Sequence, residues 1–148
     1  MKIKHVLSTK VVAPSLIGTT KEEIIRELLD LLVQAGLVSE PDIVYKDLMN
    51  RERKMSTGIQ HGVAIPHAKT VAVSELVAAI GVKREGVDFN SFDGEPSTIF
   101  IMTLSPVDRV GPHVQFLAEI SMIIKHQSAR KKILEATTAQ EILDVFGV

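Results

Sequence analysis

Two of the five histidines, His67 and His113, follow a proline and have surroundings that suit nucleophilic or anion-binding chemistry. Pro66 fixes its own φ angle and favours an extended residue before it. We therefore expect a short apolar strand, residues 63–65, to hold His67 rigidly at a strand end, where ligands of open α/β sheets bind. The alternative is a histidine that only caps a strand and bonds a carbonyl. The residues around His67 leave both interpretations open.

The second histidine is expected to lie at the start of a helix. Pro112 suits the first helical position, which places His113 in the first turn. The N–H groups and the partial positive charge of a helix N-terminus favour a bound anion and disfavour imidazolium. A neutral imidazole there could donate a hydrogen bond or act as a nucleophile. The alternative is an exposed first-turn histidine without a role.

Three further residues could bind phosphate. Arg51 lies at the end of a predicted helix, where any cation is stabilising, and its guanidinium could also hold a phosphate by two parallel hydrogen bonds. Ser56 and Thr57, followed by Gly58, could offer hydroxyl and backbone donors to the same anion. Short runs of this composition are also common in ordinary loops, so the pattern is weak by itself.

Several other chemistries are disfavoured. There is no cysteine, which excludes thiol nucleophiles, cysteine–zinc sites and iron–sulfur clusters. His61 and His67, if extended, lie about 20 Å apart, too far to share an ion. The histidine spacings of zinc enzymes, the serine-hydrolase elbow, the Walker loop and the dinucleotide-binding glycine motif do not occur. We expect no metal and no cofactor.

The composition is that of one ordinary globular domain. The chain has 148 residues, of which 45% are hydrophobic and 24% charged, with a formal net charge of −1. This balance argues against nucleic-acid binding and against direct attachment to an anionic membrane. No signal peptide or membrane-length apolar run is expected, and the lack of cysteine fits a reducing cytoplasm.

The elements that must position these residues alternate along the chain. Thr20 and Glu23 form a capping-box pattern before a helix that Gly36 ends, and Thr138 and Glu141 repeat the pattern near the C-terminus. Pro41 opens another helix, through residue 54, with Ile43, Val44 and Leu48 turned inward. Further helices are expected from residue 111 and near residue 128, and buried strands over residues 63–65, 76–82 and 98–104. We therefore expect an α/β fold, one domain over residues 1–148, with a mixed β-sheet of about five strands covered by helices on both faces.

Five segments together resemble a known family, the enzyme IIA domain of the fructose/mannitol/nitrogen-regulatory type in the bacterial phosphoenolpyruvate-dependent sugar phosphotransferase system. Arg51-Glu52 and residues 56–68, with their Ala-Ile-Pro-His core, resemble its active-site signature, and residues 113–121 resemble its second-histidine helix. Residues 86–89 and 92–96 resemble the fructose branch in particular. The resemblance covers essentially the whole chain. Gln60 departs from it, because the family usually has glycine there.

The resemblance implies a phosphocarrier. His67 matches the histidine that accepts a phosphoryl group from the histidine-containing phosphocarrier protein and passes it to a cysteine of an enzyme IIB domain. His113 matches the second histidine, which supports the first, and Arg51, Ser56 and Thr57 match positions around the phosphate. The membrane would be involved only indirectly, through an enzyme IIC component. Two partners must reach His67 in turn, so we expect a shallow depression with an apolar rim.

Two functions share this site. The fructose-like middle segment favours a component of sugar uptake. The alternative is a regulatory protein of the nitrogen-regulatory branch, in which phosphorylation of His67 controls partner binding rather than transport. Because both would use the same residues, the site cannot separate them.

Overall fold

The computed structural model describes residues 2–148. The elements follow one another as α1 (Lys2–Val6), a short 3-10 helix η1 (Thr9–Val11), β1 (Val12–Ala13), α2 (Lys21–Gln34), α3 (Pro41–Lys54), β2 (Val63–Ala64), β3 (His67–Thr70), β4 (Val77–Val87), β5 (Ser97–Pro106), α4 (Gly111–Ile124), α5 (Gln127–Glu135) and α6 (Ala139–Val145). Within the described part of the chain, no helix is long and apolar enough to cross a membrane.

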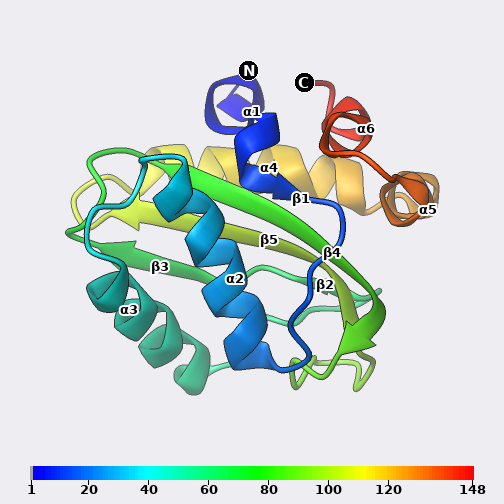
Figure 1. The fold of residues 1–148 in the computed structure, drawn as a ribbon, viewed down its shortest axis with the longest axis horizontal. Coiled ribbons are helices and arrows are strands. Elements are labelled where there is room, and N and C mark those ends of the chain that lie inside the picture. Colours follow the sequence, from blue (N-terminus) through cyan, green and yellow to red (C-terminus); the bar gives the residue numbers. More distant parts are fainter. Residues whose placement is uncertain (1) are drawn as a thin grey trace.

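The sheet is mixed and five-stranded (Figure 1). Its centre is the antiparallel pair of long strands β4 and β5. The short β1 runs parallel to β4 at one edge, and β2 and β3 both run parallel to β5 at the other. In Figure 1, α2 and α3 lie across one face of the sheet and α4 runs behind the other, and both chain ends lie on one side. The predicted fold class is confirmed.

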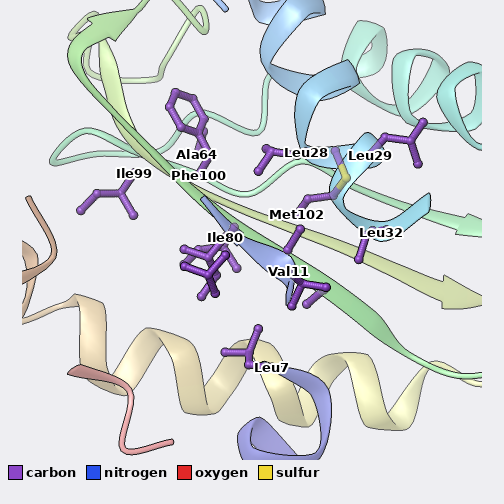
Figure 2. Packing of buried hydrophobic residues seen from close by; sticks show 14 of the residues in the cluster. Leu7, Val11, Leu28, Leu29, Leu32, Ala64, Ile80, Ile99, Phe100 and Met102 are labelled. Carbon is purple, nitrogen blue, oxygen red and sulfur yellow. The ribbon is translucent and has the colours of Figure 1, made fainter. Parts of the chain in front are cut away.

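The core fills the space between the sheet and its helices. Figure 2 shows Leu28, Leu29 and Leu32 of α2 facing one side of the sheet, while Leu7 approaches from the side of α4. Strand β5 is buried over almost its whole length, because helices cover both of its faces. Such two-sided burial explains why its sequence is nearly continuous in apolar residues.

Local signals in the sequence place the helices well. The hydroxyl of Thr20 accepts a hydrogen bond from the backbone N–H of Glu23, and the carboxylate of Glu23 accepts one from the backbone N–H of Thr20. This is the predicted capping box of α2. Gly36 follows α2 with φ +76°, as a left-handed helix stop requires. Pro41 occupies the first turn of α3 as expected. One detail is wrong: Ile43 is 42% exposed, because it lies away from the face that Val44 and Leu48 bury.

The edge strand that carries His67 differs from the prediction. The expected strand over residues 63–65 is the shorter β2, and His67 opens a further strand, β3, which the sequence did not suggest. Val63 to Thr70 keep one register along β5, with Ala64 opposite Phe100 and His67 opposite Thr103. Pro66 has no N–H to donate, so it interrupts the pairing without shifting it. His67 therefore lies within the edge of the sheet, and the chain is paired with β5 both before and after Pro66.

The N-terminal elements α1 and β1 were also not predicted. Both are short, and α1 packs against α4 while β1 pairs with β4. Their stability depends on these distant partners, because a helix of five residues is marginal by itself.

Candidate active site

His67 is oriented by the backbone just before it. Its Nδ1 lies 2.8 Å from the carbonyl oxygen of Ile65. A carbonyl only accepts, so Nδ1 carries the ring proton and Nε2 keeps an unprotonated lone pair in the neutral ring. The side chain is half-buried. A hydrogen bond to a carbonyl is what a purely structural histidine would make. The same hydrogen bond also leaves Nε2 of His67 unprotonated and able to act as a nucleophile.

His113 is buried beside the same strand pair. It lies in the first turn of α4, as predicted, but only 9% of it is exposed, so it is not a surface residue. Its Nε2 lies 2.8 Å from the hydroxyl of Thr103, the residue opposite His67 in the strand register. Burial lowers the pKa of His113, and the charges of His67 and Lys69 lower it further. His113 is therefore neutral at pH 7.

The two histidines form one site. Their ring centroids are 5.6 Å apart, with 42° between the ring planes. When the Thr103 hydroxyl donates to Nε2 of His113, the remaining ring proton is on Nδ1 and is available to an anion. The first turn of α4 adds backbone N–H groups that have no partner within the helix. The arrangement combines a nucleophilic nitrogen with neutral and backbone donors for the group it would carry.

The expected apolar rim has candidates next to His113. Val110 precedes α4 and is 41% exposed, and Val114 follows His113 and is 60% exposed. Val107, in the loop before α4, is 54% exposed. These side chains are free to contact a partner that approaches the histidines.

Arg51 lies in the last turn of α3, as expected. Its Nη1 donates to the carbonyl oxygen of Met55 at 2.8 Å, which caps the end of that helix. Within residues 2–148 no hydrogen bond or salt bridge joins it to either histidine. Its phosphate-binding role stays a prediction.

The hydroxyls of Ser56 and Thr57 already have partners inside the protein. Ser56 donates to the carbonyl of Phe89 and accepts from the backbone of Gly58. Thr57 donates to a carboxylate oxygen of Glu52 at 2.6 Å. In this arrangement neither hydroxyl is free to donate to a phosphate. Within residues 2–148 no side-chain hydrogen bond joins either residue to the two histidines, and their phosphate-binding role stays a prediction.

Glu52 was noted in the sequence only as part of the family resemblance, without a role, yet it organises the loop between α3 and β2. It is 5% exposed and accepts hydrogen bonds from both the backbone and the hydroxyl of Thr57. The ammonium of Lys21, on α2, lies 3.0 Å from the same carboxylate. A buried carboxylate needs this many partners to offset the cost of removing it from water.

Glu52→Ala should lower the free energy of unfolding by about 2–4 kcal/mol, because it leaves the buried Thr57 groups and Lys21 without their acceptor. Urea denaturation measures the change. Glu85→Ala is the matched control: it removes an exposed carboxylate 3.8 Å from Lys83 and should change stability by less than about 0.5 kcal/mol. Equal effects of the two variants would contradict the assignment of Glu52.

The structure accommodates Gln60 at the position where the family usually has glycine. The turn after it has positive φ angles at His61, 63°, and Gly62, 75°, while Gln60 itself is not in the left-handed region. The backbone N–H of His61 donates to Asp93, which fixes the turn. The glutamine side chain is exposed and strains nothing.

Across residues 2–148, no three His, Asp or Glu side chains are grouped so that they could hold a metal ion.

The sequence matches one described family over almost its whole length. Residues 5–147 match the model of "Phosphoenolpyruvate-dependent sugar phosphotransferase system, EIIA 2". The chain belongs to this EIIA family. Its resemblance in sequence is thereby confirmed.

Relatives of three kinds are similar to this EIIA chain. The "PTS system fructose-specific EIIA component" of Haloferax volcanii is 40% identical over 86% of this chain and 83% of its own. The crystal structure of nitrogen regulatory protein IIA-Ntr from Neisseria meningitidis has a TM-score of 0.91 and 25% identity, over 99% of both chains. A complex of enzyme IIA-Mtl with phosphorylated enzyme IIB-Mtl from Escherichia coli has a TM-score of 0.81 at 22% identity, over 95% of this chain and 96% of that one.

Three features of this EIIA site were missed in the sequence: the Ile65 carbonyl, Thr103 and Lys69. Only Thr103 had a usable signal. A threonine in the middle of a buried apolar strand requires a hydrogen-bond partner, which points to a polar group across the sheet edge. The other two depend on β3, which was not predicted.

Proposed function

We propose that this protein is a cytoplasmic phosphocarrier of a sugar-uptake system of the fructose type. His67 accepts a phosphoryl group from the histidine-containing phosphocarrier protein and gives it to a cysteine of an enzyme IIB domain. The observation that carries the proposal is the 2.8 Å bond between Nδ1 of His67 and the Ile65 carbonyl, which leaves Nε2 as the nucleophile beside His113.

The transfer balances without any further reactant. The lone pair of Nε2 forms a bond to phosphorus, and the bond from phosphorus to the donor's imidazole nitrogen breaks, with its electron pair returning to that ring. The onward step repeats this with a thiolate of the acceptor as nucleophile and Nε2 of His67 as leaving nitrogen. In both steps the protein supplies position and hydrogen bonds to the phosphoryl oxygens rather than covalent chemistry.

His113 and the first turn of α4 are the donors that this proposal assigns to those oxygens. The lowered pKa of His113 keeps its ring neutral, so that it donates a hydrogen bond as the neutral imidazole. Arg51 is retained as a candidate that would have to leave the Met55 carbonyl to reach the phosphate.

The uptake function is favoured by the fructose-specific relative, which is 40% identical over most of both chains. A regulatory function is the second candidate, because the nitrogen regulatory protein of Neisseria meningitidis shares the fold over 99% of both chains. In the regulatory case the phosphorylated and unphosphorylated forms would differ in partner binding, and enzyme IIB would not be an efficient acceptor.

Reconstituted transfer separates the two. The protein is incubated with phosphoenolpyruvate, enzyme I and the histidine-containing phosphocarrier, and then mixed with purified enzyme IIB domains of the fructose type. Rapid, stoichiometric labelling of the IIB cysteine supports uptake. Labelling of His67 without transfer to any IIB domain contradicts the uptake function and favours the regulatory one.

Transfer through His67 should need no metal. Enzyme I, which does use magnesium, is removed after it has charged the donor, and EDTA is then added. We expect the rates of both steps at His67 to stay within about twofold of the untreated sample, because nucleophile and donors are all side chains and backbone groups. A rapid-quench measurement that shows loss of either step on chelation would contradict this.

A further inference from the structure

Lys69 lies on the same side of the sheet edge as His67. Side chains alternate along a strand, so residues two positions apart share a face. The burial of β3 alternates accordingly: Ala68 and Thr70 are buried, whereas His67 is half-buried and Lys69 is exposed. Because the ring of His67 faces His113, Lys69 belongs to the face on which the two histidines meet.

The positive charge of Lys69 has no counter-charge there. Its neighbour in the strand register is Ser105, which is neutral and whose buried hydroxyl lacks a hydrogen-bond partner. Among residues 2–148 the ammonium of Lys69 takes part in no salt bridge. Its charge also reaches the ring of His113, whose pKa it helps to lower. A flexible ammonium of this kind is free to turn toward an anion held between the histidines.

We propose that Lys69 binds the phosphoryl group carried by His67. The proposal rests on the function proposed above and adds a cation to a site whose other assigned donors are neutral. Arg51 ends α3 and is bonded to Met55, while Lys69 is two residues from the nucleophile and unengaged. Lys69 is therefore a cation on the same strand as the nucleophile. It balances part of the charge of the phosphoryl dianion on His67.

The test measures the phosphoryl group itself, without partner proteins. His67 is phosphorylated chemically with potassium phosphoramidate, and the ³¹P signal that is absent from His67→Ala is followed as pH is varied. Lys69→Gln should raise the pKa of the second phosphoryl ionisation by about half a unit, because a nearby cation favours the dianion. Lys69→Arg should keep that pKa near the wild-type value, since the charge is retained.

Lys131→Gln is the matched control. Lys131 is exposed on α5, and its loss changes the net charge equally but away from the histidines. It should leave the phosphoryl pKa unchanged. In the transfer assay, Lys69→Gln should slow acceptance from the phosphocarrier about 5- to 10-fold and Lys131→Gln should not.

The outcomes separate this proposal from the function on which it rests. A phosphoryl pKa that is the same in Lys69→Gln and the wild type overturns the proposal, even if transfer is slowed, because Lys69 would then act on a partner protein. Failure of wild-type protein to accept phosphate from the phosphocarrier overturns the proposed function, while the titration still reports on Lys69.

Discussion

His67→Ala should abolish the incorporation of phosphate. Incubated with phosphoenolpyruvate, enzyme I and the histidine-containing phosphocarrier, the wild type should take up one acid-labile phosphate per chain and the variant none. The reason is geometric. His67 has its Nδ1 proton held by the Ile65 carbonyl, whereas the neighbouring His113 is 9% exposed and its Nε2 is engaged with Thr103. No other ring at the site offers a free, oriented nitrogen.

His61→Ala is the control for this loss. His61 is exposed in the turn before β2, and its ring can be removed without touching the paired histidines. It should accept phosphate at the wild-type rate. His67→Ala removes a hydrogen bond worth about 1 kcal/mol, so the variant should remain folded, which thermal unfolding verifies. Stoichiometric label in His67→Ala would show that another residue is the acceptor.

The helices and the central strands were readable from the sequence because their signals are local. Each of these signals acts on residues close to it in the chain, as do the capping box of α2, Gly36 after that helix and Pro41 at the start of α3. The long strands are readable because a buried strand between two helical layers is apolar throughout, as in β5. These signals were enough to predict the fold class and to place His113 in a first turn.

The strand that carries His67 was not readable for the opposite reason. Its sequence, His-Ala-Lys-Thr, is too polar for a buried strand, and it forms only because β5 lies beside it in register and α3 covers its other face. The hydrogen-bond partner of His113, Thr103, likewise lies on β5, which is distant in sequence from the strand break. The hydrogen-bond partners of side chains can also be distant in sequence. The hydroxyl of Ser56 donates to the carbonyl of Phe89, and no pattern near Ser56 in the sequence indicates this.

His113→Ala should slow transfer from His67 to enzyme IIB by about 10- to 100-fold, and slow acceptance from the phosphocarrier less. One donated hydrogen bond that strengthens in the transition state is worth on the order of 1.5–3 kcal/mol, which corresponds to this range. The onward step is affected more if the ring mainly supports charge on the departing phosphoryl group. Rapid-quench rates of the two half-reactions measure the asymmetry.

A substitution of Thr103 tests whether the effect of His113 on the onward rate depends on the orientation of its ring. Its hydroxyl is buried and bonded to Nε2 of His113, so Thr103→Val removes the support and keeps nearly the same shape. The variant should slow the onward step about 3- to 10-fold, because a typical hydrogen bond contributes about 1 kcal/mol. In a His113→Ala background the same change should have no further effect on the rate, since Thr103 acts only through that ring. Additive losses in the double variant would show that Thr103 acts on the rate independently of His113. An unchanged onward rate in His113→Ala would leave His113 as a buried structural histidine.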